Sequence, residues 1–428
     1  TMIFHYLKIA FRNLCKYKTQ NVISIIGLAV GLLCFCVCIY CSRFVENTDH
    51  CFANHDRIAE LNLYDGKADR YFSGSPIPLA EELRTWALGE TEAISSVTYP
   101  RERPYYVELS PEKTLPYELE TIEIDTCYNK IFTPEMVAGH WKMASQSLNS
   151  VILSQSMAIK IFGNAESAIG KHMTLMRRLN TSPESTPKTG GIVYTIQAVM
   201  KDISLNNSLD FMQNIDMLTV NDSEGLLQSP KRYNMTGANT YVLLSPQTTC
   251  TDLEKQFSKR DYTYTLYGEA YTVTASSMGA RLKKQGASYL GLVTGTVGTL
   301  ILLVGLINFF HFLIGSFFNR TKEYSIMKMI GCNWKQLFCL LFTQSLIVIS
   351  ISSILVLSGI ELLGNHMNFS LPGFAMTFTS ETLLIHALQY IVLLIILCAI
   401  ICLSVSIRIR RITVQTGIYG NNKRRGKQ

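Results

Sequence analysis

Reactive side chains gather in one short stretch of this chain, DHCFANH at residues 49–55. It holds Asp49, His50, Cys51 and His55, and these residue types bind transition metals in many proteins. The stretch directly follows a long apolar run, where polar residues are expected in any protein. We therefore predict no metal site here.

The sequence lacks the motifs of the common catalytic sites. It contains no G-x-x-x-x-G-K-[ST] loop, no G-x-S-x-G elbow and no H-E-x-x-H helix. In the nearest approach to a phosphate-binding loop, FGNAESAIGKH, the glycines lie too far apart and Lys171 is followed by His172. We predict a chain that is not an enzyme and that binds no cofactor of its own.

Long apolar runs dominate the rest of the sequence. The chain is 48% apolar and 17% charged, whereas about 25% is the usual charged share in soluble proteins. A helix needs about 20 apolar residues to cross a bilayer. Four windows without any charged residue exceed that length, and they predict transmembrane spans at 20–42, 288–318, 336–360 and 382–407.

Basic residues orient these spans. Lysine and arginine gather before the first span, in the loop 319–335 and in the tail 408–428, while the connection 362–380 has none. Positively charged loops stay in the cytoplasm, so we predict cytoplasmic termini and an outward-facing segment 43–287. In a bacterium this is a multi-pass inner-membrane protein with a periplasmic domain. The basic tail is then a signal for orientation in the membrane, and we predict that it does not bind nucleic acid.

The first residues have the pattern of an amphipathic helix. Over 2–18, Lys8, Arg12 and Lys16 fall on one side at helical spacing, and apolar residues gather on the other. We predict that this helix lies in the cytoplasmic membrane surface, with its basic groups near lipid phosphates. The alternative is an ordinary extension of the first span.

Segment 43–287 predicts a large α+β domain. Strands are expected at 57–64, 94–99, 149–154, 193–203, 239–245 and 269–276, and helices at 78–88, 155–162 and 248–259. The two β-α-β units at its ends predict one lobe from 43–114 and 237–287. A second lobe, 115–236, is then inserted in the first. The sequence does not decide whether two of Cys51, Cys127 and Cys250 form a disulfide.

Small residues mark a packing face in the second span. Gly291, Gly295 and Gly298 lie at about one-turn spacing, and small residues let helices approach closely in membranes. The face predicts a helix–helix or a dimer seam. No Asp, Glu, Lys or Arg lies deep in any span, which disfavours a proton- or ion-coupled transporter. Energy for any work would then come from a separate protein.

The loop between spans two and three, NRTKEYSIMKMIGCNWKQLF, has the pattern of a helix–turn–helix elbow. Gly331 fits the position just after a helix, and Asn333 fits the N-cap of a helix that begins at Trp334. A rigid elbow that presents Lys322, Glu323 and their neighbours is suited to a groove on a cytosolic partner. The alternative is that these charges only solvate a helix end and meet lipid phosphates.

Several stretches resemble MacB/FtsX-like permeases of ATP-binding-cassette (ABC) systems. The opening YLKIAFRNLCKYKTQNVISIIGLAVGL is similar to that family's start, and VILSQSMAIKIFGNAESAIGKHMTL to its outer-domain run. NRTKEYSIMKMIGCNWKQLFCLLFTQSLIV resembles its most recognisable stretch. The resemblance is spread over most of the chain and is weaker within 60–148 and 204–238.

The resemblance implies a mechanotransmission permease. Such permeases have four spans and an outer domain of two lobes (Porter and Sabre), form dimers with themselves or with a similar permease, and bind two copies of a cytosolic ATPase that uses ATP and Mg. Only about 20 residues precede the first span, so we expect no fused ATPase domain. The positions that match the family's ATPase-coupling element are Arg320, Lys322, Glu323, Ser325, Lys328, Gly331 and Trp334.

Three functions remain open from the sequence. The first is a permease subunit that handles envelope cargo (a peptide, amphiphile, lipoprotein or drug), with a periplasmic adaptor and an outer-membrane channel as further partners. The second is an FtsX-like regulator that switches an envelope hydrolase or sensor by the same motion. The third is a receptor without an ATPase, which the elbow disfavours because an anchor needs only one span.

Overall fold

The computed structural model divides the chain into two compact units. The helical unit comprises Thr1–Glu46, Ala287–Ser370 and Met376–Gln428, and the strand-rich unit comprises Asn47–Gly286 and Leu371–Ala375. The structure describes residues 8–10, 12, 16, 18–72, 74–110, 113–175, 191–209, 212–223, 225–228, 236–280, 287–319, 321–364, 368–371, 374–377 and 380–411.

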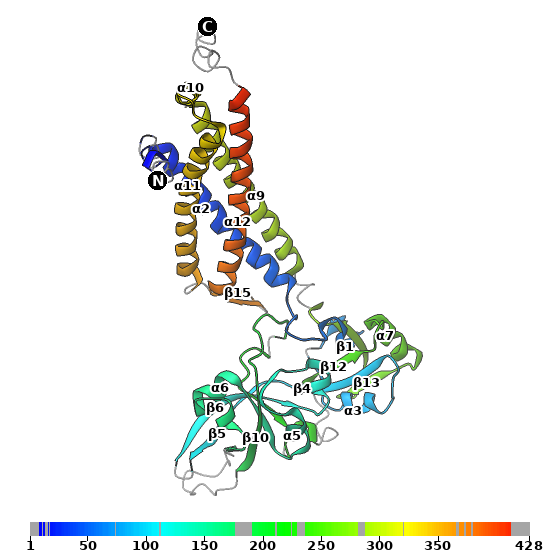
Figure 1. The fold of residues 1–428 in the computed structure, drawn as a ribbon. Helices are drawn as coiled ribbons and strands as arrows, with labels where there is room; N and C mark the ends of the chain where they lie inside the picture. Colours follow the sequence, from blue (N-terminus) through cyan, green and yellow to red (C-terminus); the bar gives the residue numbers. More distant parts are fainter. Residues whose placement is uncertain are drawn as a thin grey trace. The chain divides into compact units, whose positions relative to one another are not determined.

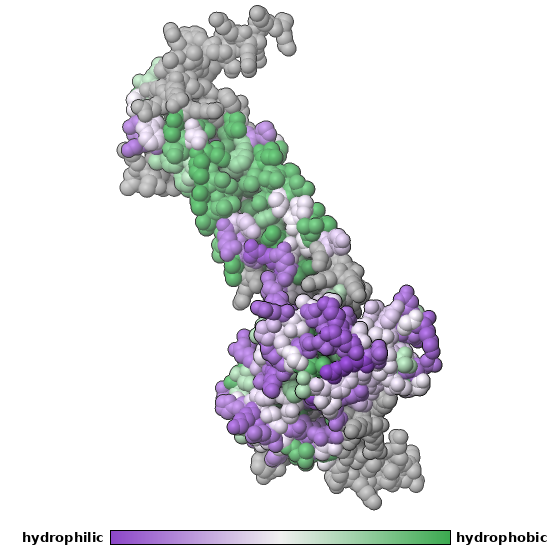
Figure 2. All heavy atoms as spheres, turned by 90° about the vertical axis from the view of Figure 1, so that its right-hand side faces the viewer, coloured by the Kyte–Doolittle hydropathy of each residue, from purple (hydrophilic) through white to green (hydrophobic). Residues whose placement is uncertain are grey.

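Four long helices form the helical unit (Figure 1). They are α2 (Lys18–Glu46), α9 (Ala287–Asn319), α11 (Trp334–Gly364) and α12 (Ser380–Arg411), with the short α10 (Thr321–Met329) between α9 and α11. Each long helix contains a stretch of 25 to 29 residues that is long and apolar enough to cross a membrane. The four predicted spans are therefore confirmed as helices of that kind, and Figure 2 shows their visible face covered by apolar side chains.

Glycines bring α2 and α9 into close contact along their length. A Cβ atom added to Gly298 would lie 2.5 Å from Cys38 Cβ, and one added to Gly295 would lie 2.9 Å from Ser42 Oγ. Further along the pair, the Cβ position of Gly31 is 3.3 Å from the Cα of Gly305. The glycine face of the second span is thus occupied by the first span of the same chain.

An open sheet occupies one part of the strand-rich unit. Its order is β4 (Thr91–Thr98), β12 (Thr236–Leu244), β1 (Ile58–Asp65), β14 (Glu269–Ser277) and β13 (Thr263–Leu266). The helices α3 (Leu79–Arg84) and α7 (Cys250–Lys259) connect β1 to β4 and β12 to the β13–β14 hairpin. This is the split β-α-β arrangement of ferredoxin-like sheets, and it confirms the strands and helices expected at both ends of the segment.

Six strands close into a ring in the middle of the sequence. The order is β6 (Lys113–Ile124), β5 (Arg101–Ser110), β9 (His172–Leu175), β10 (Ile192–Met200), β8 (Ser150–Ser154) and β11 (Met217–Val220), which pairs back to β6. The inward residues of these strands form one buried apolar cluster that includes Tyr105, Val151 and Tyr194. The helix α6 (Gln155–Phe162) covers it and ends, as predicted, at Gly163.

The ring and the open sheet are hydrogen-bonded to each other through β4 and β6, at the pair Val97 and Ile124. The short β2 (Arg70–Tyr71), β3 (Ser75–Pro76) and β7 (Met136–Gly139) pair with β1, β12 and β10, and the short helices α4 (Tyr128–Phe132) and α5 (Trp141–Gln146) lie between β6 and β8 in the sequence. The division into two lobes stays a prediction, because one continuous sheet includes all these strands. The predicted lobe boundary after residue 114 falls inside β6, and β5, which the prediction assigns to the first lobe, lies in the ring. The sequence pattern of a long hairpin does not show which sheet the hairpin joins.

We predict that Gly298→Leu strongly destabilises the helical unit. The leucine side chain has no space beside Cys38, so the two helices must separate, and overpacking of this kind costs about 3 kcal/mol. The matched control is Val304→Leu, which enlarges an exposed position of the same helix. Thermal unfolding of the purified chain in detergent should show a clearly lower midpoint for Gly298→Leu alone. Equal midpoints would contradict the close contact of α2 and α9.

Candidate functional site

The elbow between α9 and α11 is closed by a specific turn. The N–H of Cys332 donates to the carbonyl of Met327 at 3.0 Å, and Gly331 between them has a φ of 97°. This is the long-range bond of a Schellman motif, in which a left-handed residue follows the helix. An added Cβ on Gly331 would meet nothing within 4 Å, so the backbone conformation, not packing, favours glycine here.

The next helix is capped within two residues of that turn. Asn333 accepts the first helical bonds from Gln336 and Leu337, and its Oδ1 accepts a bond from the Trp334 N–H at 2.8 Å. Gln336 reaches back and accepts the N–H of Asn333 through Oε1 at 2.9 Å. The predicted cap is confirmed. The capping role of Gln336 was missed, although its spacing three residues after an N-cap is a known signal.

The side chains of the elbow differ from the expected set. Ser325 is only 7% exposed and Tyr324 is also buried, so neither is presented to a partner. Glu323 and Trp334 are partly exposed. Lys322 and Lys328 lie in α10, but their side chains, like the whole of Arg320, lie outside the described residues.

An exposed apolar face on the elbow was missed by the sequence analysis. Ile326 and Met329 of α10 and Ile330, the residue directly after it, follow helical spacing, and Ile330 is 82% exposed. Their i, i+3, i+4 spacing is the signal that could have identified them, because helices that enter apolar grooves use such anchors. The elbow therefore presents apolar as well as charged groups.

The N-terminal segment contacts this elbow through an ion pair. Lys16 Nζ lies 3.3 Å from Glu323 Oε1, and both side chains are substantially exposed. A pair of this kind contributes little stability, about 0–1 kcal/mol, but it fixes which segments are neighbours. Lys8, Arg12 and Lys16 are helical and exposed. Most of the apolar face of the predicted helix 2–18 lies outside the described residues, so the membrane-surface assignment stays a prediction.

Three reactive residues of the stretch 49–55 make other contacts in the structure. No group of three or more possible ligands occurs among the described residues. His50 and His55 lie with ring centroids 4.3 Å apart, and His55 pairs with Asp56. The carboxylate of Asp49 instead accepts a backbone N–H from Ser208 at 2.6 Å. Cys51, Cys127 and Cys250 are free thiols.

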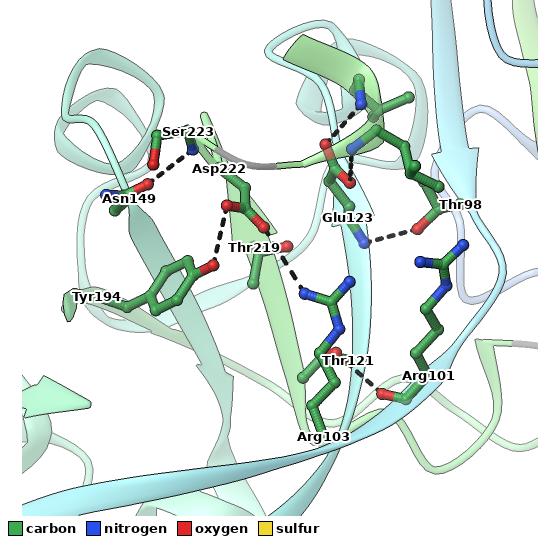
Figure 3. A network of polar contacts seen from close by, with 12 residues as sticks. Thr98, Arg101, Arg103, Thr121, Glu123, Asn149, Tyr194, Thr219, Asp222 and Ser223 are labelled. Carbon is green, nitrogen blue, oxygen red and sulfur yellow. Dashed lines mark hydrogen bonds and ion pairs between the residues drawn. The ribbon is translucent and has the colours of Figure 1, made fainter. Parts of the chain in front are cut away.

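A buried polar network in the strand-rich unit was also missed (Figure 3). Glu123 on β6 accepts the N–H groups of Leu226 and Leu227 at 2.8 and 2.7 Å. An added Cβ on Gly225 would lie 2.1 Å from the Glu123 carboxylate, so only glycine lets this turn approach so closely. Burial raises the pKa of Glu123 to about 7, although the two N–H bonds lower it.

A second buried carboxylate belongs to the same network. Asp222 accepts the hydroxyl of Tyr194 at 2.9 Å and lies 3.8 Å from the guanidinium of Arg103. Figure 3 shows Tyr194 and Arg103 reaching Asp222 from different strands. Burial and the neighbouring Asp222 raise the pKa of Tyr194. Polar bonds thus connect the turns after β11 to strands of the ring.

One family model matches the chain. Residues 295–414 match the model described as FtsX-like permease C-terminal, a range that includes the elbow, α11 and α12. The match confirms the predicted resemblance to MacB/FtsX-like permeases and supports a role as an ABC transporter permease. No protein of curated function matches the chain.

Solved structures of low identity also resemble part of the chain. They include a permease-protein domain from Porphyromonas gingivalis, at 20% identity and a TM-score of 0.40, covering 53% of this chain and 93% of that one. The periplasmic region of MacB from Actinobacillus actinomycetemcomitans has 14% identity and a TM-score of 0.37, with 56% of this chain and 96% of that one covered. The extracellular domain of the noncanonic ABC-type transporter YknZ from Gram-positive bacteria has 12% identity and a TM-score of 0.31, with 51% of this chain and 99% of that one covered.

We predict that Glu123 makes stability fall as pH rises. Its pKa is about 7 in the folded chain and about 4.3 in an unfolded chain. Between these values the folded state holds a proton that the unfolded state releases, so the free energy of unfolding decreases with pH, by about 2–3 kcal/mol from pH 5 to pH 8. Thermal unfolding of the full chain in detergent at pH 5 and pH 8 measures this decrease.

Two variants isolate the contribution of Glu123 from that of other titrating groups. Glu123→Gln removes the titration, and its midpoint should depend less on pH than that of the wild type. Glu118→Gln changes an exposed position of the same strand and should keep the wild-type dependence. The assignment is wrong if Glu123→Gln and the wild type lose the same stability between pH 5 and pH 8.

Proposed function

Because residues 295–414 match FtsX-like permeases, we propose that this chain is the non-catalytic permease subunit of a MacB/FtsX-like ABC transporter. A separate cytosolic ATPase binds ATP and Mg and performs the hydrolysis. The permease transmits the resulting motion to its strand-rich unit, which handles envelope cargo. The observation that carries this proposal is the elbow, whose turn is fixed by the Schellman motif at Gly331 and the cap at Asn333 and which exposes an apolar face.

The exposed face of α10 fits a groove on a protein partner. Ile326, Met329 and Ile330 provide three neighbouring apolar anchors, and grooves for amphipathic helices recognise anchors at this spacing. Glu323 of the same helix adds a charged group to this elbow, and charged groups beside apolar anchors help to specify orientation and partner. A loop that only connected two spans would gain nothing by exposing three large apolar side chains to the cytosol.

The elbow can transmit a displacement because hydrogen bonds fix the backbone of its turn. The Schellman turn at Gly331 fixes the end of α10, and the Asn333 cap fixes the start of α11. A push on α10 therefore moves α11 and, through the chain, α9. The glycine contacts between α9 and α2 make these two helices move together. Both connections to the strand-rich unit then move at once.

The assembly follows from this arrangement and from the family resemblance. Two copies of the ATPase bind two permease chains, which are either identical or similar. The distribution of basic residues supports a bacterial inner-membrane protein with both termini and the elbow on the cytoplasmic side. The strand-rich unit is then in the periplasm. A periplasmic adaptor and an outer-membrane channel are the further partners that export of cargo would require.

We predict that Ile330→Glu releases the ATPase. A charge in the centre of an apolar contact must be desolvated without a partner, which weakens binding by at least about tenfold. The matched control Ile330→Leu keeps an apolar side chain and should bind as the wild type does. Co-purification in mild detergent with the ATPase encoded beside the permease, with ATP hydrolysis as a second readout, measures the effect. Stoichiometric, active complexes of Ile330→Glu would refute the docking surface.

A further inference from the structure

Three segments far apart in the sequence meet where the strand-rich unit begins and ends. The first connection, residues 47–57, follows α2, and the second connection, residues 278–280, follows β14 on the way to α9. The third segment, residues 204–208, lies between β10 and β11 of the ring. Asp49 stands at their meeting point and is only 5% exposed.

Asp49 binds the ring segment through its side chain and its backbone. Its Oδ1 accepts the N–H of Ser208 at 2.6 Å, and its own N–H donates to the carbonyl of Asn206 at 3.1 Å. The neighbouring Thr48 hydroxyl donates to Asn206 Oδ1 at 3.2 Å. A carboxylate that accepts a backbone N–H makes a short, strong bond, and here it fixes a segment outside the strands.

The second connection passes against the same carboxylate. A Cβ atom added to Gly279 would lie 2.9 Å from Asp49 Oδ2, and Gly279 has a φ of 73°. One residue earlier, the N–H of Met278 donates to the carbonyl of Ile58 at 3.0 Å. Both the close approach and the left-handed backbone therefore require glycine at this position.

Apolar contacts anchor both connections beside the Asp49 contacts. Phe52 of the first connection and Met278 of the second belong to one buried cluster, which also contains Ile124 and Leu218 of the ring and Tyr241 of the open sheet. Phe52 packs edge-on against Phe132, with ring centroids 5.3 Å apart. The first connection is thus held by the hydrogen bonds of Asp49 to the ring segment. The second is held by the bond from Met278 to Ile58 and lies against the Asp49 carboxylate. Both connections share the same core packing.

The backbone conformation of Asp49 restricts which residues can occupy this position. Its φ of 72° lies in the left-handed region, which costs energy for most residues but is tolerated by aspartate and asparagine. An asparagine can keep this backbone and one acceptor oxygen. Asp49→Asn therefore removes the charge and little else.

We propose that Asp49 is a positioning residue that fastens both connections and the ring segment 204–208 into one rigid base. Displacement of α2 and α9 would then move the strand-rich unit as a single body, because its first and last described segments and the ring segment are held together at Asp49. This role in transmission rests on the proposed function. The fastening itself is a property of the strand-rich unit and can be tested without an ATPase.

Hydrogen exchange of the full chain in detergent tests the fastening. With Asp49→Asn, backbone amides of 204–209 and of 278–280 should exchange about tenfold faster or more, in both segments together, because they open as one unit. Gly279→Ala should have the same effect from the opposite side, since its methyl group displaces the carboxylate. The matched control is Asp56→Asn, which changes an aspartate of the same connection whose side chain is 89% exposed.

The outcomes separate the fastening from a local defect. Unchanged exchange in 204–209 and 278–280, or faster exchange confined to 47–52, would overturn the proposal. Asp49→Asn and Gly279→Ala affecting different segments would overturn it as well. Normal exchange in Asp56→Asn shows that loss of a negative charge in this connection is not itself the cause.

A second measurement connects the fastening to transmission. In the complex with the ATPase, nucleotide should change the exchange of the strand-rich unit in the wild type. Asp49→Asn should lose that change by at least half while ATP hydrolysis stays within twofold. A full nucleotide response in Asp49→Asn would overturn its role in transmission. A wild type without any response would instead refute the proposed function, and the exchange result on the chain alone would still decide whether Asp49 fastens the three segments.

Discussion

The close contact between α2 and α9 constrains the rest of the chain. These two helices flank the strand-rich unit in the sequence, and their glycines bring the backbones together at Gly31 and Gly305. A unit that leaves from one helix and returns to the other has its two ends fixed near each other. Its first long strand, β1, accordingly pairs with its last, β14, from Ala59 opposite Ser277 onward. The open sheet is built on that pair, and the ring is inserted between its other strands.

Local chemistry made part of this structure predictable. Charge-free windows predict the four long helices because crossing a bilayer demands length and apolarity from each window alone. Gly331 and Asn333 predict the elbow because the left-handed turn and the cap are determined by one residue each. Thr249 and Asp252 likewise form the capping box of α7. These features depend on neighbours within about four residues, which a single sequence shows directly.

Contacts between distant residues were not predictable in the same way. Glu123 and Leu227 are 104 positions apart, and Asp49 and Ser208 are 159 apart. Nothing in the spacing of either carboxylate indicates which backbone it will meet. The stretch containing Asp49 shows residue types that can bind a metal, but a sequence does not show that Asp49 instead meets the backbone of Ser208. The sequence shows the glycine face of α9, whereas only the structure shows that α2 packs against it.

The two buried carboxylates have the same physical task in different places. Asp49 holds residues 204–208 and Glu123 holds the turn at 225–228, and both do so by accepting backbone N–H groups. Apolar packing is not directional, so a segment held by packing alone can slide before it transmits a force. A hydrogen bond weakens steeply when its angle changes, and it therefore resists displacement from the start. If the chain transmits motion as proposed, these bonds are the contacts that hold its irregular segments in place while it does so.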